Sequence, residues 1–396
     1  MNSDRDVVFT GAVRTAIGTF GGSLAAVPPT ELGARVIREA VTRSGIEPEE
    51  VGHVVFGQVI HTEPKDMYLA RVAAMGADIP KEVPAMTLNR LCGSGLQAIV
   101  SAAQLIRLGD ADIAVAGGAE SMSRAPHVVP DARFGKRLGN AAMIDMLTSA
   151  LTDPFGNGHM GVTAENVAAD AHISREQQDA LALNSHRRAV RALDEGRFRD
   201  QVLPIEVTVG RDKREFSRDE HARSDASAVN LAKLRTVFKE GGTVTAGNAS
   251  GINDGAAALT LMTRSEAIKR GIRPLGRLVG YAHAGVDPSR MGIGPVPAVK
   301  AALSKAGLSV SQMDVIESNE AFAAQACAVA KELGFPDDRT NPNGGAIALG
   351  HPVGATGAII MVKLLYELQR INGRYGLATM CIGGGQGIAA IVEREA

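Results

Sequence analysis

NRLCGSG at residues 89–95 is the stretch from which the rest of the chain can be interpreted. It places Cys92 on a glycine-flanked turn, directly before a helical pattern of apolar residues that runs from Leu96 to Ile106. The two glycines let backbone and substrate approach closely. A thiol at the start of a helix faces unsatisfied backbone N–H groups and the positive end of the helix dipole, and both favour the thiolate. The turn is therefore typical of a nucleophile, although free cysteine is also among the most buried residue types.

The composition of the 396 residues, 45% apolar and 21% charged, is ordinary for a soluble globular enzyme. A formal net charge of −1 offers no electrostatic basis for binding nucleic acid or an anionic membrane surface. No apolar run reaches the ~18 residues of a membrane span, and the polar first residues lack a signal-peptide core. The three cysteines, Cys92, Cys327 and Cys381, fit neither a disulfide framework nor a zinc site. We therefore expect a cytoplasmic enzyme without a metal.

Strands alternate with helices along the first part of the chain, which predicts an α/β fold with a parallel or mixed sheet covered on both faces. Part of this order recurs late in the chain. A helix at 299–306, a strand at 314–316, a glycine-rich turn with His351, a long helix and a strand at 377–381 follow one another. The recurrence predicts two similar halves, with Cys92 and His351 at related places.

Residues 122–251 differ in composition from both halves. They contain clustered arginines and five of the nine histidines. Ser174 and Gln177 form a capping-box pattern at the start of a helix. We interpret this segment as an insertion. Arginine clusters of this kind more often form a solvated surface than a phosphate-binding site.

Polar residues stand among glycines or small residues at four further places: His159, Asn319, His351 and Cys381. A histidine within reach of Cys92 would deprotonate it, as acyl transfer through a thiol requires. Backbone N–H groups near Cys92 and in the glycine run 383–385 would form an oxyanion hole. The alternatives are that His351 caps a turn, that Cys381 is a small core residue and that His159 lies on the surface.

Taken together, these stretches resemble the motifs of the thiolase family, and the resemblance covers essentially the whole chain. The four matching stretches are NRLCGSG at 89–95, NEAFA at 319–323, GHPVG at 350–354 and CIGGGQG at 381–387. Their order along the chain is that of the family.

The resemblance implies a thiolase-like fold of two βαβαβαββ halves in a layered α-β-α-β-α arrangement. Residues 1–121 with 252–274 would form the N-terminal half, and residues 275–396 the C-terminal half. Residues 122–251 would form an inserted loop domain that binds coenzyme A (CoA). Family members are commonly homotetramers built as dimers of dimers, so we expect one here.

The resemblance also implies a ping-pong mechanism. His351 takes the proton of Cys92, whose thiolate forms an acyl-enzyme, and Cys381 removes the α-proton of acetyl-CoA. One oxyanion site would use His351 with a water held by Asn319, and a second the backbone N–H groups of Cys92 and Gly383. CoA, acetyl-CoA and short acyl-CoA would be substrates, with no permanently bound cofactor. The positions that match the CoA and acyl pocket are Leu151, His159, Met160, Arg223, Asn230, Leu231, Phe238, Ala246, Ala249, Ser250, Ile252, Met291, Ala321 and Phe322.

The chain departs from the family pattern in places that concern acyl-chain length. Gly158 stands where a tyrosine often precedes the His-Met-Gly motif, and Asn230-Leu231 where a Ser-Met pair is common. His159 matches biosynthetic members, and residues 61–68 are similar to short-chain β-ketothiolases of bacterial polyester-forming pathways. The expected function is thus reversible condensation of acetyl-CoA with a short acyl-CoA to a 3-ketoacyl-CoA. The alternatives are a degradative 3-ketoacyl-CoA thiolase of fatty-acid β-oxidation, a fatty-acid-type condensing synthase and a non-catalytic acyl-CoA carrier.

Overall fold

The computed structural model describes residues 5–209 and 211–395, and within them an eleven-stranded mixed β-sheet forms the centre of the molecule. Its strands are β1 (Val7–Thr15), β2 (Gly18–Thr19), β3 (His53–Gly57), β4 (Ala85–Leu88), β5 (Ile113–Ser121), β10 (Val202–Leu203), β13 (Asn253–Thr263), β14 (Gly276–Gly285), β15 (Val315–Ser318), β16 (Tyr375–Ile382) and β17 (Gln386–Glu393). They follow the order β15-β16-β17-β14-β1-β13-β5-β3-β4, with β2 beside β13 and β10 beside β1. The two halves of the sheet meet where β1 pairs with β14 through only two residue pairs.

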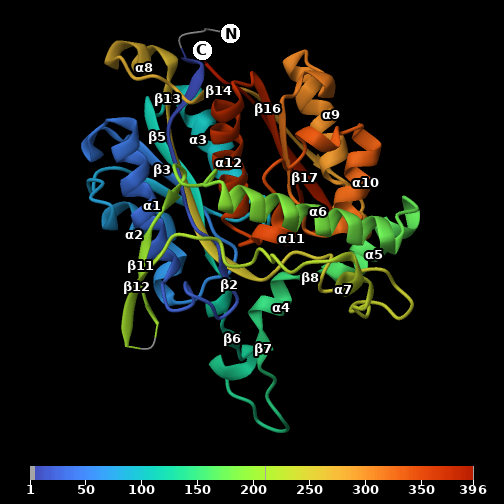
Figure 1. Cartoon of the computed structure of the whole chain (residues 1–396). Helices are drawn as coiled ribbons and strands as arrows, with labels where there is room; N and C mark the ends of the chain where they lie inside the picture. Colours follow the sequence, from blue (N-terminus) through green and yellow to red (C-terminus); the bar gives the residue numbers. More distant parts are fainter. Residues whose placement is uncertain (1–4, 210, 396) are drawn as a thin grey trace.

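Helices cover both halves of the sheet and fill the space between them (Figure 1). They are α1 (Pro29–Ser44), α2 (Leu69–Gly76), α3 (Ser94–Leu108), α8 (Arg264–Arg270), α9 (Pro295–Ala306), α10 (Ala323–Leu333), α11 (Ala346–Leu349) and α12 (Thr356–Ile371). Helices α1 and α2 lie outside the N-terminal half, and α9, with α10 beside it, lies outside the C-terminal half. Helices α3 and α12 pack together in the middle. This is the predicted α-β-α-β-α layering, which is therefore confirmed.

The predicted duplication is confirmed, with one difference between the halves. The N-terminal half runs β1-α1-β3-α2-β4-α3-β5-β13, which is βαβαβαββ. The C-terminal half runs β14-α9-β15-α10-α12-β16-β17, and its third strand is reduced to a single parallel bridge between Ile316 and Thr340. Asn341 follows in the left-handed region at φ 46°, and Pro342 carries no N–H. The extended pairing therefore stops after one residue.

Glycines let α3 and α12 approach to backbone contact. A Cβ on Gly95 would lie 2.6 Å from the backbone nitrogen of Ala358, and one on Gly357 would lie 2.2 Å from that of Leu96. Gly95 thus serves contact between the two halves, rather than the approach of substrate that its position beside Cys92 predicts. The paired helices begin next to each other, so the residues that precede them, including Cys92 and His351, come together.

One stretch of helix, Leu91–Leu108, is long and apolar enough to cross a membrane by length and composition, and it is the one such stretch among the described residues. Its side chains at Leu96, Ile99 and Ile106 are fully buried against the sheet and α12. A helix that is apolar on most sides and lies in the middle of a large core passes the same test. Its central position accounts for its composition.

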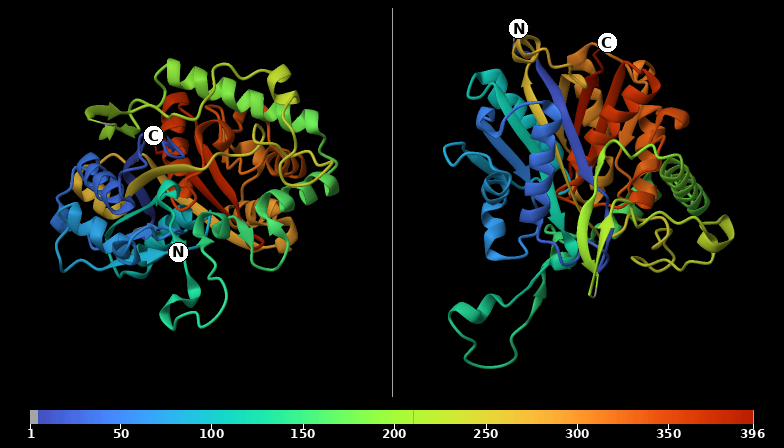
Figure 2. Two further views of the ribbon diagram at one scale, coloured as in Figure 1. Left: turned by 90° about the horizontal axis from the view of Figure 1, so that it is seen from below. Right: turned by 60° about the vertical axis from the view of Figure 1, so that its left-hand side comes forward.

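The insertion between β5 and β13 lies across one end of the sheet (Figure 2). Its elements are β6 (His127–Val128), β7 (Ile144–Asp145), α4 (Met146–Ala150), β8 (Thr152–Asp153), β9 (Gly158–His159), α5 (Met160–Asp170), α6 (Arg175–Asp194), β11 (Ile205–Val209), β12 (Asp212–Phe216) and α7 (Ala228–Ala232). The capping box of Ser174 and Gln177 at the start of α6 is confirmed. Residues 123–145 form a hairpin that projects away from the body in every view (Figures 1 and 2).

Candidate active site

Cys92 lies on a tight turn between β4 and α3. The turn is held by Asn89, whose Oδ1 accepts from the Leu91 N–H at 2.8 Å, and by Ser94, whose Oγ accepts from the Arg90 N–H and donates to the Leu91 carbonyl. Leu91 adopts φ 46°, a left-handed conformation that is unfavourable for a branched residue. Strain of this kind persists where surrounding contacts impose it, and it clusters at functional sites. Here it sets the direction in which Cys92 leaves the turn.

The surroundings of the Cys92 sulfur both oppose and support a negative charge. Burial raises the pKa of Cys92, while the backbone N–H groups of Gly383 and of Cys92 itself face the sulfur and lower that pKa. The structure thus brings Gly383, from the β16–β17 turn, beside Cys92. Two N–H groups that converge there are also placed to stabilise an oxyanion on a group attached to the sulfur.

Cys381 lies at the end of β16 and is buried. Burial raises the pKa of its thiol, and the negative charge of the Cys92 thiolate raises it further. The two sulfurs are therefore near enough to influence each other. Cys381 belongs to a buried apolar cluster with Met160, Met291, Ala321 and Phe322, four of the residues predicted to line the substrate pocket.

His351 is held as the tautomer that leaves Nε2 free. Its Nδ1 lies 2.7 Å from Thr356 Oγ1, and that hydroxyl donates its own proton to the Pro352 carbonyl at 2.8 Å. This geometry favours a proton on His351 Nδ1 that Thr356 Oγ1 accepts, and in the neutral ring Nε2 then carries no proton. Burial lowers the pKa of His351 to about 4, which keeps the ring neutral near pH 7. His351 is thus a base with its free nitrogen already exposed to the site.

Asn319 faces this free nitrogen. Its Nδ2 lies 3.5 Å from His351 Nε2, and the amide is buried. The backbone N–H of Asn319 donates to the Thr379 carbonyl, which anchors it beside β16. The backbone N–H of His351 donates to Asn253 Oδ1 at 2.9 Å, so the N-terminal half also helps to hold the histidine.

A cleft of about 560 Å³ leads from the surface to His351. Nine of the fourteen predicted pocket residues line it, namely Leu151, His159, Arg223, Phe238, Ala246, Ala249, Ser250, Ile252 and Phe322. Cys92 packs against the apolar cluster of Ile60, Met122, Leu147 and Val353, two of which, Met122 and Val353, also line the cleft. The predicted nucleophile therefore adjoins the inner part of this cleft.

His159 is neither a surface histidine nor a free one. Its Nδ1 accepts from the Gly161 N–H at 3.0 Å, and its ring stacks on Phe238 with centroids 4.7 Å apart. Phe238 in turn meets Phe322 edge-on at 6.0 Å. The three rings form a continuous aromatic wall on one side of the cleft. Burial lowers the pKa of His159, so the wall is uncharged.

Asn230 and Leu231 are not brought into this cleft. They line a neighbouring cavity of about 120 Å³ that shares His221, Arg223 and Ala246 with it. Leu231 packs on α6 and α11 instead. Ser227 Oγ caps the short helix α7 by accepting from the Asn230 N–H. Their predicted place in the CoA pocket stays a prediction, because this cavity shares lining residues with the cleft.

Sequence reasoning missed several residues that hold the site together. Besides Thr356 and Asn253, Glu120 is buried and accepts from the backbone N–H groups of Val59, Ile60 and Gly354 at 2.8–3.1 Å. It thereby ties the turn after His351 to the N-terminal half. Asn253 and Glu120 are polar residues at the ends of strands whose other residues are mostly small or apolar. This contrast is the sequence feature from which their role could have been predicted. Thr356 had none beyond its place at the start of a helix.

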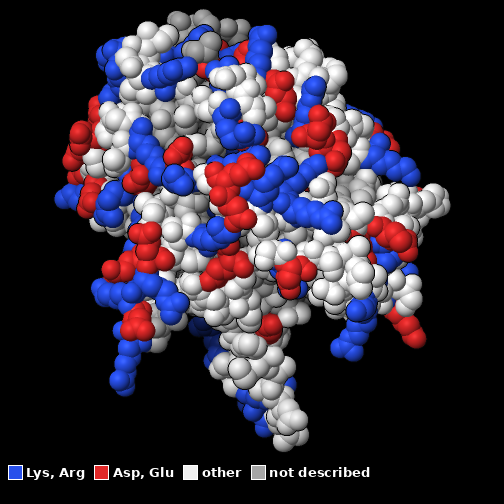
Figure 3. Space-filling view, in the orientation of Figure 1, with Lys and Arg blue, Asp and Glu red and all other residues white. Residues whose placement is uncertain are grey.

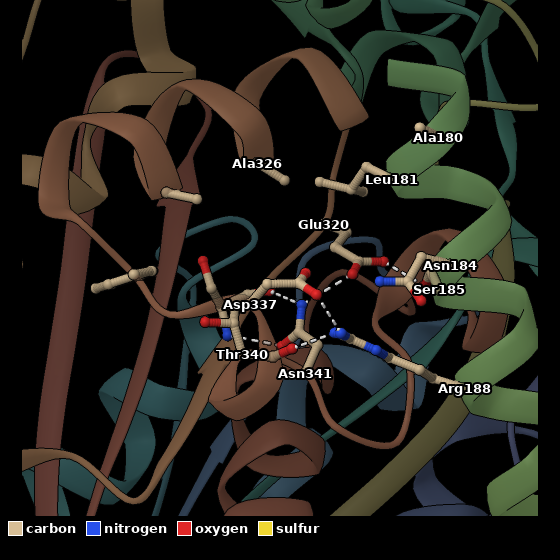
Figure 4. Close-up of a pocket in the computed structure, with 13 residues that line it drawn as sticks. Ala180, Leu181, Asn184, Ser185, Arg188, Glu320, Ala326, Asp337, Thr340 and Asn341 are labelled. Atoms are coloured by element: carbon tan, nitrogen blue, oxygen red, sulfur yellow. Dashed lines mark hydrogen bonds and ion pairs between the residues drawn. The ribbon is translucent and has the colours of Figure 1, made fainter. Parts of the chain in front are cut away.

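A second cavity, of about 310 Å³, lies between α6 and the C-terminal half (Figure 4). Glu320 reaches toward it, and its carboxylate accepts from Ser185 Oγ at 2.7 Å and Asn341 Nδ2 at 2.9 Å. None of the predicted site residues lines this cavity. Within residues 5–209 and 211–395, no group of three or more His, Cys, Asp or Glu side chains is arranged to hold a metal ion.

Comparison with known proteins agrees with this arrangement. The family model described as "Thiolase, N-terminal domain" matches residues 7–265, and "Thiolase, C-terminal domain" matches residues 272–394. Beta-ketothiolase BktB of Cupriavidus necator is 63% identical over 98% of this chain and 99% of its own. An acetyl-CoA acetyltransferase of Chromobacterium violaceum is 54% identical over 98% of this chain and 100% of its own.

Solved structures agree as well. An acetyl-CoA acetyltransferase of Bacillus anthracis superposes with a TM-score of 0.97 at 46% identity, over 100% of both chains. Human mitochondrial 3-ketoacyl-CoA thiolase in complex with CoA superposes with a TM-score of 0.96, also at 46% identity, over 100% of this chain and 99% of that one. The chain therefore belongs to the thiolase family of acyltransferases.

Proposed function

We propose that this thiolase is a β-ketothiolase that reversibly condenses acetyl-CoA with a short acyl-CoA to a 3-ketoacyl-CoA and free CoA. One observation carries the proposal: Cys92, Cys381, His351 and Asn319 converge at and beside the inner part of a cleft whose lining matches the expected CoA pocket. Two thiols, a neutral histidine and two convergent N–H groups are what acyl transfer followed by carbon–carbon bond formation requires.

In the first half-reaction, His351 Nε2 takes the proton of Cys92, and the thiolate attacks the thioester carbonyl of the acyl-CoA. The C–S bond to CoA breaks, and the departing sulfur takes the proton of Cys381. In the second half-reaction, the Cys381 thiolate removes an α-proton from acetyl-CoA, and the enolate attacks the acyl group on Cys92. Cys92 leaves as thiolate and recovers its proton from His351, so every proton is accounted for. The raised pKa of Cys381 makes its thiolate a strong base for this step.

The preference for short chains rests on relatives rather than on the fold. The two solved structures named as acetyl-CoA acetyltransferase and as 3-ketoacyl-CoA thiolase share the same 46% identity with this chain. The β-ketothiolase of C. necator is more similar, at 63% over nearly the full length. This favours the short-chain, biosynthetic assignment, with CoA and acyl-CoA as passing substrates, over the degradative alternative.

The assay is CoA-dependent cleavage of acetoacetyl-CoA, 3-ketovaleryl-CoA and 3-ketodecanoyl-CoA by the wild type and by Cys92→Ser. We expect the wild type to cleave the two short substrates well and the C10 substrate poorly, and we expect Cys92→Ser to lose activity on all three. A clear preference for the C10 substrate would contradict the proposal and favour the degradative alternative. Cleavage that survives in Cys92→Ser would remove Cys92 as the nucleophile.

We also propose that the chain forms a homotetramer in the cytoplasm. The hairpin of residues 123–145 exposes Phe134, Leu138 and Met143 at 93%, 89% and 69%, and it carries few charges toward the viewer in Figure 3. Within the described part of the chain, strand β4 ends the sheet with one edge unpaired, and Met86 on it is exposed. An unpaired edge and an apolar projection are both typical of subunit contacts. The cytoplasm suits an enzyme with two catalytic thiols, because it is a reducing compartment.

A further inference from the structure

Two buried carboxylates flank Asn319 in the chain: Glu317, near the end of β15, and Glu320, which follows Asn319. The Asn319 N–H donates to the Thr379 carbonyl at 3.0 Å and so continues the pairing of β15 with β16 by one residue. Successive side chains of a strand alternate between its faces, so Glu317 and Asn319 share one face. Glu320 lies on the other face and belongs to the cavity of Figure 4. Glu317 faces α12, where Lys363 Nζ donates to its Oε2 at 2.7 Å. Both side chains of this ion pair are almost fully buried.

Two acceptor atoms on this face lack a hydrogen-bond donor among the described residues. Glu317 Oε1 and Asn319 Oδ1 are buried and have no hydrogen-bond partner within the part of the chain that the structure describes. Leaving a buried acceptor unsatisfied destabilises the folded protein. Both residues line one small cavity of about 10 Å³, together with Thr356 and Lys363. A cavity of this size has room for a single water molecule, and the two unpartnered oxygens give such a water polar partners in an otherwise mostly apolar lining.

The orientation of Asn319 follows from the tautomer of His351. Because His351 Nε2 is unprotonated, it requires a donor, and Asn319 Nδ2 is the atom opposite it. The carbonyl oxygen of the Asn319 amide must then point the other way, and Oδ1 and Glu317 Oε1 both face inward as acceptors. A water molecule has two protons to donate, and here two acceptors lack donors.

We propose that one buried water bridges Glu317 Oε1 and Asn319 Oδ1, and that Glu317 and Lys363 are thereby positioning residues for the Asn319 amide. Lys363 holds the Glu317 carboxylate, the carboxylate holds the water, and the water prevents the amide from turning over. Asn319 Nδ2 is then fixed toward the site. This inference rests on the proposed role of Asn319 in oxyanion stabilisation.

The direct test is a crystal structure of the wild type at a resolution that shows ordered water. We expect a water peak within hydrogen-bond distance of both Glu317 Oε1 and Asn319 Oδ1. An empty cavity, or a Glu317 carboxyl in direct contact with Asn319, would overturn the proposal.

The kinetic test uses the double variant Glu317→Met/Lys363→Met, which removes both charges. Removing one charge alone would leave the other buried and unpaired, whereas apolar replacement of a buried pair is often neutral for stability. We expect kcat for acetoacetyl-CoA cleavage to fall about 10- to 100-fold with KM nearly unchanged, because a misplaced catalytic group costs rate rather than binding. Glu317→Gln leaves the Lys363 charge unpaired, so its melting temperature should fall, but the folded variant should keep most of kcat, since the side-chain amide still binds both Lys363 and the water.

Two further variants separate the possible explanations. Glu367 is also a buried carboxylate, one turn beyond Lys363 on α12, but it binds Asn343 and Arg370 instead. Glu367→Met should lower the melting temperature without lowering kcat. Asn319→Ala should lower kcat at least as much as the double variant does. Wild-type kcat in Asn319→Ala would contradict the proposed role of Asn319 itself. If kcat falls in Asn319→Ala but not in the double variant, Asn319 keeps its role and only the positioning role of Glu317 and Lys363 is overturned.

Discussion

At the scale of single residues, the state of His351 depends on one hydroxyl. Thr356→Val keeps the shape of the side chain but removes the acceptor for His351 Nδ1–H. The imidazole proton is then free to move to Nε2, where it would face the Asn319 amide donor. We expect kcat/KM for acetoacetyl-CoA to fall about 10- to 100-fold, the usual effect of losing a partner that orients a functional histidine. Steady-state kinetics at pH 7 measures this.

Thr356→Ser is the matched control, because it restores the hydroxyl and should restore activity. The rate of Cys92 alkylation by iodoacetamide is a second measurement. It should fall in Thr356→Val and stay near wild type in Thr356→Ser, since His351 removes the Cys92 proton. Wild-type kinetics in Thr356→Val would show that the tautomer does not depend on this bond.

At the scale of elements, the separation of α3 and α12 is set by glycine. Gly95→Ala would place a methyl group 2.6 Å from the backbone nitrogen of Ala358, where no flexible side chain can yield. We expect a loss of about 1–3 kcal/mol of unfolding free energy, the usual cost of overpacking a core. Calorimetric melting measures it. Gly280→Ala is the control, because its nearest neighbours would lie 3.9 Å away, and an equal loss in both variants would contradict the argument.

At the scale of the whole molecule, the projecting hairpin predicts assembly. Phe134→Ser combined with Leu138→Ser removes the two most exposed apolar side chains of the hairpin. We expect the particle mass, measured by light scattering on a sizing column, to fall from that of a tetramer to that of a smaller oligomer. Ile268→Ser is the control, because Ile268 is 71% exposed on α8, at the opposite end of the molecule (Figure 1). A mass unchanged by the double substitution would exclude the hairpin from the interface.

Sequence patterns predicted the elements and their duplication because both follow from local features. The capping box of Ser174 and Gln177 acts within one turn of helix, and apolar periodicity acts within one element. The match of four motifs in order named the family and the residues of the site. Asn230 and Leu231, predicted by position to bind CoA, line a neighbouring cavity that shares three residues with the cleft, and their role stays a prediction. Matching a motif predicts the position of a residue but not the direction of its side chain.

What the sequence alone determined is thus the layered α/β fold, the family, and the residues that meet at the cleft. Only the tertiary structure decided their chemical states. The free Nε2 of His351 depends on Thr356, and the convergence of two N–H groups on Cys92 depends on Gly383. The proposed orientation of Asn319 depends on Glu317 across a shared cavity. Gly383 lies far along the chain from Cys92. Thr356 and Glu317 are near His351 and Asn319 in sequence, but they act through side-chain positions that depend on how the chain folds. The physical reason is that burial and hydrogen-bond partners set proton positions, and both arise from contacts that no local pattern in the chain contains.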